Sequence, residues 1–257
     1  MKILVIMGSP RKGDSYEVTQ LIEKIMQSLG EVNFEYLWLK DARLELCKGC
    51  YACFVKGEKF CPLKDDRDKI ENAMNASDGV IFASPVYLFN VTALMKNFMD
   101  RFAYLCHRPR YFNKYAMLVS TVGGGFGLFQ TLQALDWAAS SWGFTVVHKL
   151  GLTSFSLKSA ALRRKPEHRI RYAATRFYDV IGSKEKFSPR LLSLIGFKVA
   201  KTYFAKADKE NADFIYWNER GWLSRDARYY FPIRINIFKR IIASLIFKVA
   251  RLGKSFG

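Results

Sequence analysis

Apolar and mixed patterns alternate along the first 150 residues. Short, nearly continuous apolar runs predict buried strands, and apolar residues spaced three or four apart predict helices between them. Strands that alternate with helices of this length favour a parallel sheet covered on both faces, with ligands at the carboxyl ends of the strands. The predicted strands cover residues 2–7, 32–39, 79–83, 115–121 and 145–150, and the predicted helices cover 17–29, 66–76, 91–104 and 128–142.

The last part of the chain has a different pattern. A helix over 163–181 completes a first domain, residues 1–182, and residues 183–257 form a basic, mainly helical extension. Amphipathic stretches cover 190–207 and 236–251, and lysines and arginines interrupt both too often for a membrane span. The second stretch has Ile237, Ile241, Leu245 and Val249 on one face, with Lys239, Arg240, Lys248 and Arg251 around it.

Charge is concentrated in this extension. The chain has 41 Lys+Arg and 23 Asp+Glu, and residues 156–257 hold 23 of the cations and 8 of the acids, a balance of 23 − 8 = +15 out of +18. A basic amphipathic helix can lie on an anionic membrane, so peripheral membrane contact through 236–251 is one interpretation. The favoured one is packing on the first domain or across a homo-oligomer, because Trp217 and Trp222 between the stretches suggest a core. No nucleic-acid motif accompanies the charge.

Three strand ends carry the candidate ligand site. Residues 8–15, GSPRKGDS, follow the first strand and open a helix, which suits a phosphate, although a solvated turn is an equal interpretation from this loop alone. Residues 84–90, SPVYLFN, follow the third strand, and 121–127, TVGGGFG, follow the fourth. Together they predict a cleft for a phosphorylated planar ligand. The loops match neither a dinucleotide fingerprint nor an NTPase phosphate loop.

Four of the five cysteines, Cys47, Cys50, Cys53 and Cys61, lie within fifteen residues as C-x2-C-x2-C-x7-C, followed by Pro62. Short spacings of this kind favour an iron-sulfur cluster. The alternatives are free or redox-active thiols without a cluster, and a structural zinc site, which usually has paired knuckles set further apart. Clustered cysteines, and an apolar start too short for a signal peptide, favour the cytoplasm.

These loops, with CPLKDD after the cysteines and VTALMKNFMDRF after SPVYLFN, resemble the flavodoxin-like NADPH-dependent FMN reductase family, particularly its iron-sulfur flavoprotein branch. The resemblance covers residues 1–150. It implies FMN and, on the four cysteines, a 4Fe-4S cluster. The implied cofactor-binding residues are Ser9, Arg11, Lys12, Gly13 and Ser15 at the phosphate, with Pro85, Val86, Tyr87, Asn90, Thr121, Gly123 and Gly124 around the ring.

The resulting prediction is a flavoprotein oxidoreductase that passes electrons from NAD(P)H or a reduced protein donor to a small-molecule or protein acceptor. The flavin carries this chemistry, so no side chain is assigned a catalytic role. His107, His148 and His168 are scattered and do not suggest a triad or a metal site. The alternative function is a non-enzymatic electron carrier or redox-sensing interaction protein.

Overall fold

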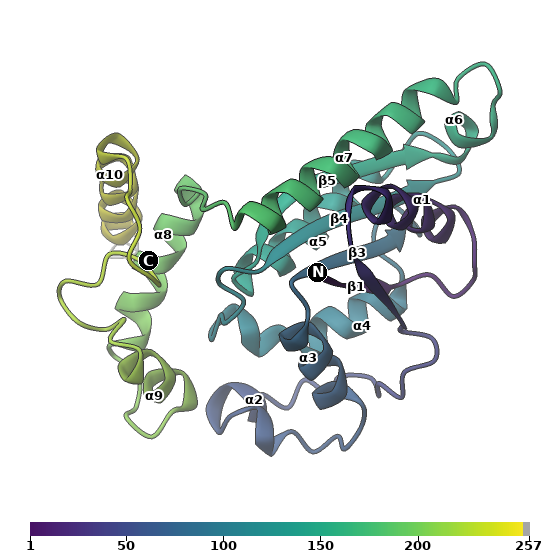
Figure 1. Cartoon of the computed structure of the whole chain (residues 1–257). Helices are drawn as coiled ribbons and strands as arrows, with labels where there is room; N and C mark the ends of the chain where they lie inside the picture. Colours follow the sequence, from purple (N-terminus) through teal and green to yellow (C-terminus); the bar gives the residue numbers. More distant parts are fainter. Residues whose placement is uncertain (254–257) are drawn as a thin grey trace. The chain divides into compact units, whose positions relative to one another are not determined.

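The computed structural model describes residues 1–253, with side chains through residue 247. Its centre is a five-stranded sheet in the order β2-β1-β3-β4-β5, and every neighbouring pair is parallel (Figure 1). This is the flavodoxin-like order, so the predicted doubly wound sheet is confirmed. The strands are β1 Lys2–Met7, β2 Asn33–Trp38, β3 Gly79–Pro85, β4 Tyr115–Val122 and β5 Thr145–Thr153.

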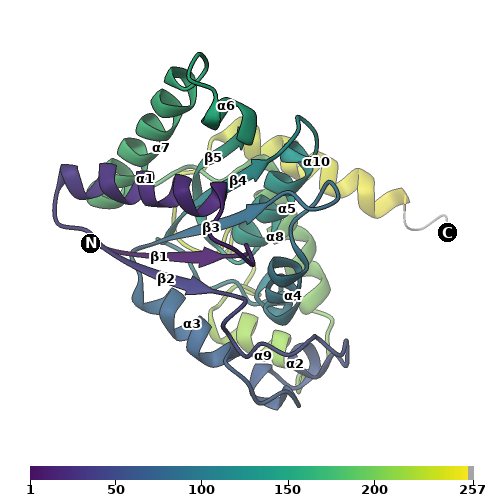
Figure 2. The same cartoon turned by 90° about the vertical axis from the view of Figure 1, so that its right-hand side faces the viewer.

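Helices cover both faces of the sheet. Figure 2 shows α1, Asp14–Leu29, and α7, Arg164–Ser183, side by side on one face. The opposite face carries α3, Arg67–Ala76, α4, Ala93–Arg101, and α5, Leu128–Ser141. Because parallel strands are buried on both sides, consecutive residues of β1 from Ile3 to Met7 are all inaccessible to solvent. The sheet and its covering helices therefore form a buried framework that positions the loops at the strand ends.

The observed helices and strands differ from the predicted ones mainly in where they begin and end. The helix predicted over 91–104 is α4 followed by a 3-10 turn at Ala103–Cys106, and β5 continues three residues beyond its predicted end at Leu150. Four short helical segments were not predicted, because one or two turns show no clear hydrophobic period. They are α2 Ala52–Val55, η1 Glu58–Phe60, α6 Ser154–Lys158 and α9 Ala212–Glu219.

The chain forms two compact units. The first contains Met1–Lys48 and Leu63–Glu185, and the second contains Gly49–Pro62 together with the chain from Lys186 onward. The segment Gly49–Pro62, which carries three of the four clustered cysteines, therefore groups with the C-terminal extension. Within this second unit α2 packs against α9. The predicted division of the chain at residue 182 remains a proposal.

An aromatic core holds the second unit together. Trp217 of α9 is fully buried, stacks on Phe197 of α8, Leu191–Phe204, at 5.5 Å between ring centroids, and meets Trp222 edge to face at 5.2 Å. The Trp222 indole donates a hydrogen bond of 2.7 Å to the carbonyl of Tyr230. Aromatic pairs of this geometry add stability beyond the area that they bury. As the sequence suggested, the tryptophans of the extension belong to a core.

Helix α10, Ile237–Gly253, packs along α8 in this unit, and Lys198 of α8 donates a hydrogen bond of 2.5 Å to Ser244. Ala243, next to Ser244, is fully buried. The apolar face predicted for packing is exposed instead: Ile237, Ile241 and Leu245 have half or more of their surface accessible. Among the described residues of the second unit, no segment covers this apolar face, and its packing on the first domain or across a homo-oligomer stays a prediction. The side chains of Val249, Lys248 and Arg251, which the sequence also assigned to this helix, lie outside the described residues.

None of the helices that the structure describes is both long enough and apolar enough to cross a membrane.

Candidate functional site

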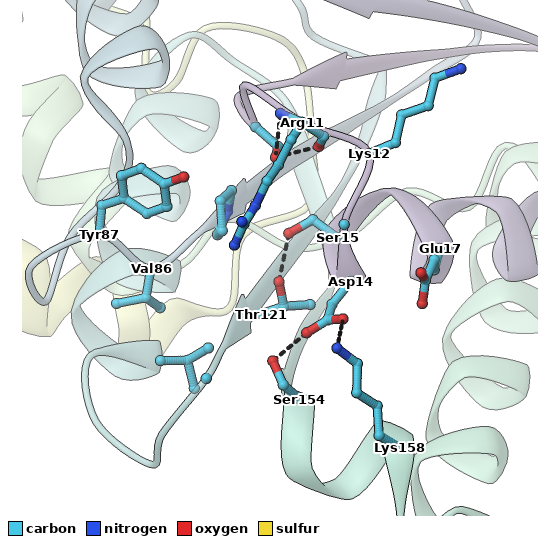
Figure 3. Close-up of a pocket in the computed structure, with 15 residues that line it drawn as sticks. Arg11, Lys12, Asp14, Ser15, Glu17, Val86, Tyr87, Thr121, Ser154 and Lys158 are labelled. Atoms are coloured by element: carbon cyan, nitrogen blue, oxygen red, sulfur yellow. Dashed lines mark hydrogen bonds and ion pairs between the residues drawn. The ribbon is translucent and has the colours of Figure 1, made fainter.

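A cavity of about 450 Å³ opens at the carboxyl end of the sheet (Figure 3). Its size falls in the range of small-molecule and cofactor sites. The lining comes from loops that follow four strands, β1, β3, β4 and β5. It consists of Ser9, Arg11, Lys12, Gly13, Asp14, Ser15, Glu17, Pro85, Val86, Tyr87, Thr121, Val122, Gly123, Ser154 and Lys158.

The loop after β1 is held by hydrogen bonds between the Ser9 side chain and the backbone of the same loop. The buried Ser9 hydroxyl donates a hydrogen bond of 2.7 Å to the Arg11 carbonyl and accepts one of 3.3 Å from the Arg11 amide. Helix α1 then begins at Asp14, and among the described residues no side chain caps its amide groups. Uncapped amides and the helix dipole favour an anion at this point. The local geometry thus suits the phosphate predicted for this loop.

One hydrogen bond joins the β1 loop to β4. The hydroxyls of Ser15 and Thr121 are 2.6 Å apart, and both residues are almost fully buried. These residues are 106 positions apart in the sequence, and the parallel order β1-β3-β4 brings them to the same edge. The structure therefore brings the predicted phosphate loop and the predicted ring-binding loop into direct contact.

The SPVYLFN loop forms a tight turn. Tyr87 and Asn90 exchange two backbone hydrogen bonds of 2.8 and 3.0 Å, and between them Leu88 and Phe89 have positive φ angles of 44° and 62°. The Asn90 side-chain oxygen accepts a bond of 2.8 Å from the Val91 amide. Asn90 is thus occupied in the turn and does not belong to the cavity lining, whereas Pro85, Val86 and Tyr87 do.

This turn is fixed to the neighbouring strands. The Val86 amide donates to the Thr121 carbonyl at 2.8 Å. Thr92, which caps α4, donates from its hydroxyl to the Gly8 carbonyl at 2.6 Å and accepts from the Met95 amide at 3.2 Å. Thr92 was not predicted as part of the site. It links the β1 loop to the helix that follows the SPVYLFN loop.

The glycine run after β4 leaves open space. A methyl group built on Gly123 or Gly124 would meet no atom within 4 Å. Only Gly123 lines the cavity, and Gly124 lies outside the lining. A flat ring could approach the backbone of Gly123 closely, which fits the ligand shape expected from the sequence.

Sequence reasoning missed the fourth wall of the cavity. The Ser154 hydroxyl donates a short hydrogen bond to the Asp14 carboxylate, and the Lys158 ammonium lies 3.2 Å from the same carboxylate. Both partners follow β5, whose end was placed at Leu150, so the loop after it did not enter the prediction. The lining residues Asp14, Glu17, Val122, Ser154 and Lys158 were all absent from the predicted site.

The two cations of the β1 loop point in different directions. Figure 3 shows the Arg11 side chain reaching into the cavity between Tyr87 and Ser15, whereas the Lys12 side chain extends away from it. The Lys12 ammonium lies over the ring of Tyr16, 5.6 Å from its centroid. Arg11 is therefore the cation of this loop that can contact a bound anion directly.

The cysteines lie outside this cavity. Cys47 and Cys50 are exposed on irregular chain, Cys53 lies in α2, and Cys61 follows η1. Four thiols are a suitable donor set for an iron-sulfur cluster. In the part of the chain that the structure describes, no three Cys, His, Asp or Glu side chains gather into a metal-binding group. The chemistry of the donors fits a cluster, and the thiols would have to converge to hold one.

Buried charges hold the two ends of the cysteine segment. Arg101 of α4 forms an ion pair with Asp65, and their side chains are only 1% and 3% exposed. Arg101 also donates to the Glu45 carbonyl at 2.8 Å, and Asp65 accepts from the Glu45 amide at 2.9 Å. Asn97, one turn earlier in α4, accepts from the Cys47 amide at 3.2 Å. We call Asp65, Asn97 and Arg101 the clasp.

The clasp connects two parts of the first unit. It fixes the chain that leads into the cysteines to α4, and α4 begins at Ala93, three residues after the last residue of the SPVYLFN loop. Burial alone would raise the pKa of Asp65, but the Arg101 side chain and the amides of Glu45 and Arg67 lower it below the usual value of an aspartate. The carboxylate is thus ionised in the folded protein at neutral pH.

Comparison with known proteins agrees with this geometry. The family model described as NADPH-dependent FMN reductase matches residues 1–155. This chain belongs to that family. As a member of this family it is an FMN-dependent oxidoreductase. The cavity at the strand ends is its candidate flavin site.

Its relatives place this chain in the iron-sulfur flavoprotein branch of the family. An iron-sulfur flavoprotein of Clostridioides difficile is 31% identical over 76% of this chain and 85% of its own length. An iron-sulfur flavoprotein of Archaeoglobus fulgidus is 28% identical over 87% of this chain and all of its own length. The solved structure of RosB with a bound intermediate aligns with a TM-score of 0.57 over 92% of each chain at 12% identity, which shows a shared fold.

Proposed function

We propose that the cavity holds FMN, with its phosphate at the β1 loop and its ring between Pro85–Tyr87 and Thr121–Gly123. The observation that carries this proposal is the convergence of these three loops on one cavity, joined by the Ser15–Thr121 and Val86–Thr121 hydrogen bonds. When bound, FMN would supply the redox chemistry. The amides and hydroxyls of the β1 loop would orient the phosphate, and the apolar side of Val86 would exclude water from the ring.

Asn90 and Gly124 have a weaker place in this proposal. The family resemblance implied both as ring contacts, but Asn90 closes a turn and neither residue lines the cavity. Thr92 and Lys158 take their place as supporting residues. Thr92 positions the β1 loop through the Gly8 carbonyl, and Lys158 pairs with Asp14 and so offsets a negative charge beside the proposed phosphate.

Arg11 and Lys12 provide a matched test of the phosphate position. Arg11→Met should weaken FMN binding about ten- to hundredfold, the equivalent of one hydrogen bond to a charged group. Lys12→Met removes the same charge from the next residue, whose side chain points away from the cavity, so its effect should be only a small, salt-dependent one. Fluorescence titration of flavin-free protein measures both. Equal losses in the two variants would argue against a direct Arg11 contact.

The cysteines support a second cofactor. The names of the relatives and the four thiols favour a 4Fe-4S cluster on Cys47, Cys50, Cys53 and Cys61. When bound, the cluster would exchange single electrons with the flavin. Anaerobic purification followed by iron and sulfide analysis tests this proposal: about four of each per chain are expected, and Cys53→Ser should lose them. Flavin without iron in the wild type would leave a simpler reductase, and tightly bound zinc would favour a structural site.

For the electron donor and the electron acceptor we propose chemical classes. NAD(P)H or a reduced protein would donate, and a small molecule such as a quinone, or a protein, would accept. The alternative is an electron carrier or redox sensor without turnover of its own. Anaerobic NADH and NADPH oxidation with a quinone acceptor separates these functions, because steady oxidation requires an enzyme, whereas a carrier is reduced only by its protein partner.

Two wider features also belong to the proposal. Cluster thiolates need a reducing compartment, so we place the protein in the cytoplasm. We also propose a homo-oligomer. Sedimentation velocity of the purified protein tests the second point.

A further inference from the structure

A continuous apolar surface of the described chain is exposed on α10. We infer that this helix docks the protein on an anionic lipid surface. The inference goes beyond the proposed redox function and does not depend on either cofactor. It rests on three observations: which side of α10 packs, which side chains remain exposed, and the charge of the surrounding chain.

The side of α10 that packs against α8 carries small and polar residues. Ala243 is fully buried and Ser244 accepts a hydrogen bond from Lys198 of α8, while Lys239 and Arg240 are only half-exposed. A helix that folds onto its own protein normally buries its apolar stripe. Here the orientation is reversed, so no described segment of the second unit covers the stripe.

The exposed stripe is large and continuous. Phe238 is 72% exposed and Leu245 57%, and their neighbours on the same side are 43% or more exposed. Residues spaced three and four apart lie on one side of a helix, so the stripe forms a single strip along its axis. Contiguous apolar surface of this kind marks an interaction site. The strip consists of Ile237, Phe238, Ile241, Ile242, Leu245 and Ile246.

The positive charge of the chain around the strip indicates which class of partner binds it. The 31 residues from 227 to 257 contain seven lysines and arginines and no aspartate or glutamate. A second copy of the chain would carry the same positive charge in this stretch, which opposes self-association. An anionic bilayer offers both an apolar layer for the strip and negative head groups for the cations, as in interfacial helices. Since no described helix can span a bilayer, the contact would be peripheral.

Co-sedimentation of the full chain with vesicles tests this inference. We expect binding to vesicles of phosphatidylcholine with phosphatidylglycerol at low salt, weaker binding as salt rises, and little binding to phosphatidylcholine alone. The double variant I241Q/L245Q should bind at least about tenfold more weakly, because it removes two side chains from the apolar layer. The matched control is Trp137→Gln on α5, where another apolar side chain, 66% exposed, is removed far from the strip in sequence.

Three outcomes would overturn the inference. The first is no binding of the wild type to the anionic vesicles at low salt. The second is equal loss of binding in the Trp137→Gln control and the α10 variant. The third is a smaller oligomer in the α10 variant than in the wild type by sedimentation velocity without lipid, because the strip would then face a second copy. Far-UV circular dichroism and the melting temperature confirm that both variants are folded.

Discussion

Replacing Arg101 by methionine is expected to lower the free energy of unfolding by about 3–5 kcal/mol, the typical cost of leaving one charge of a buried pair without its partner. The variant leaves the Asp65 carboxylate, whose side chain is 3% exposed, and removes the donor to the Glu45 carbonyl. Denaturant unfolding followed by circular dichroism measures the loss. The chain leading into Cys47 should open with the clasp.

A matched pair on the same helix provides the control. Lys96 and Asp100 also form an ion pair on α4, but their side chains are 59% and 44% exposed. Lys96→Met should therefore change stability by no more than about 0.5 kcal/mol. If both variants lose the same stability, the burial of the clasp has no special importance and the account of it is wrong.

The Arg101 effect should depend on pH. Because the pKa of Asp65 is lowered in the folded protein, the stability that its carboxylate contributes is fully present above the pKa of an ordinary aspartate and is lost as the pH falls through the folded pKa. The difference in stability between wild type and Arg101→Met should shrink in acid, where the carboxylate of the variant can take up a proton. A difference that does not shrink at any acid pH at which the wild type is still folded would contradict this role of Asp65.

Gly127→Ala is expected to damage both folding and flavin binding. Gly127 precedes α5 with a φ of +92°, and a Cβ there would lie 2.6 Å from Val86 Cγ1 and 2.9 Å from the Cα of Phe89. The backbone conformation alone costs about 1–3 kcal/mol for a residue with a side chain. The clash would also move Val86, which lines the cavity. Thermal unfolding and FMN titration of the same variant measure the two effects.

Gly125→Ala is the control for this substitution. Gly125 lies in the same glycine run, and a methyl group there would meet no atom within 4 Å. Its stability should stay within about 0.5 kcal/mol of the wild type. Gly127→Ala with wild-type stability and wild-type flavin affinity would show that the loops after β3 and β4 are not coupled as the structure suggests.

Much of the fold was predictable because the apolar runs of parallel strands are unusually clear. Residues such as Ile3 and Val119 are buried on a two-sided sheet, so their strands appear as continuous apolar segments. The three strand-end loops followed directly from those strands. Ten of the twelve predicted cofactor residues line one cavity, since parallel strands all end at the same edge.

Other features depend on contacts that a linear pattern does not contain. Asp65 and Arg101 look like ordinary solvated charges in the sequence, yet the turn of the cysteine segment buries them together. Ser154 is absent from the predicted site because the sequence pattern ends the preceding strand at Leu150, whereas β5 continues to Thr153. The amphipathic period of α10 correctly predicted a helix, but periodicity cannot tell which side of a helix its own chain covers.

The central claim is that the cavity at the strand ends binds FMN, and direct measurement of flavin in the purified wild-type protein tests it best. Absorption spectroscopy of the protein as purified, and after addition of FMN to flavin-free protein, should give close to one FMN per chain. Arg11→Met should reduce this affinity and Lys12→Met should largely preserve it. A colourless wild-type protein that is folded and does not bind added FMN would contradict the account.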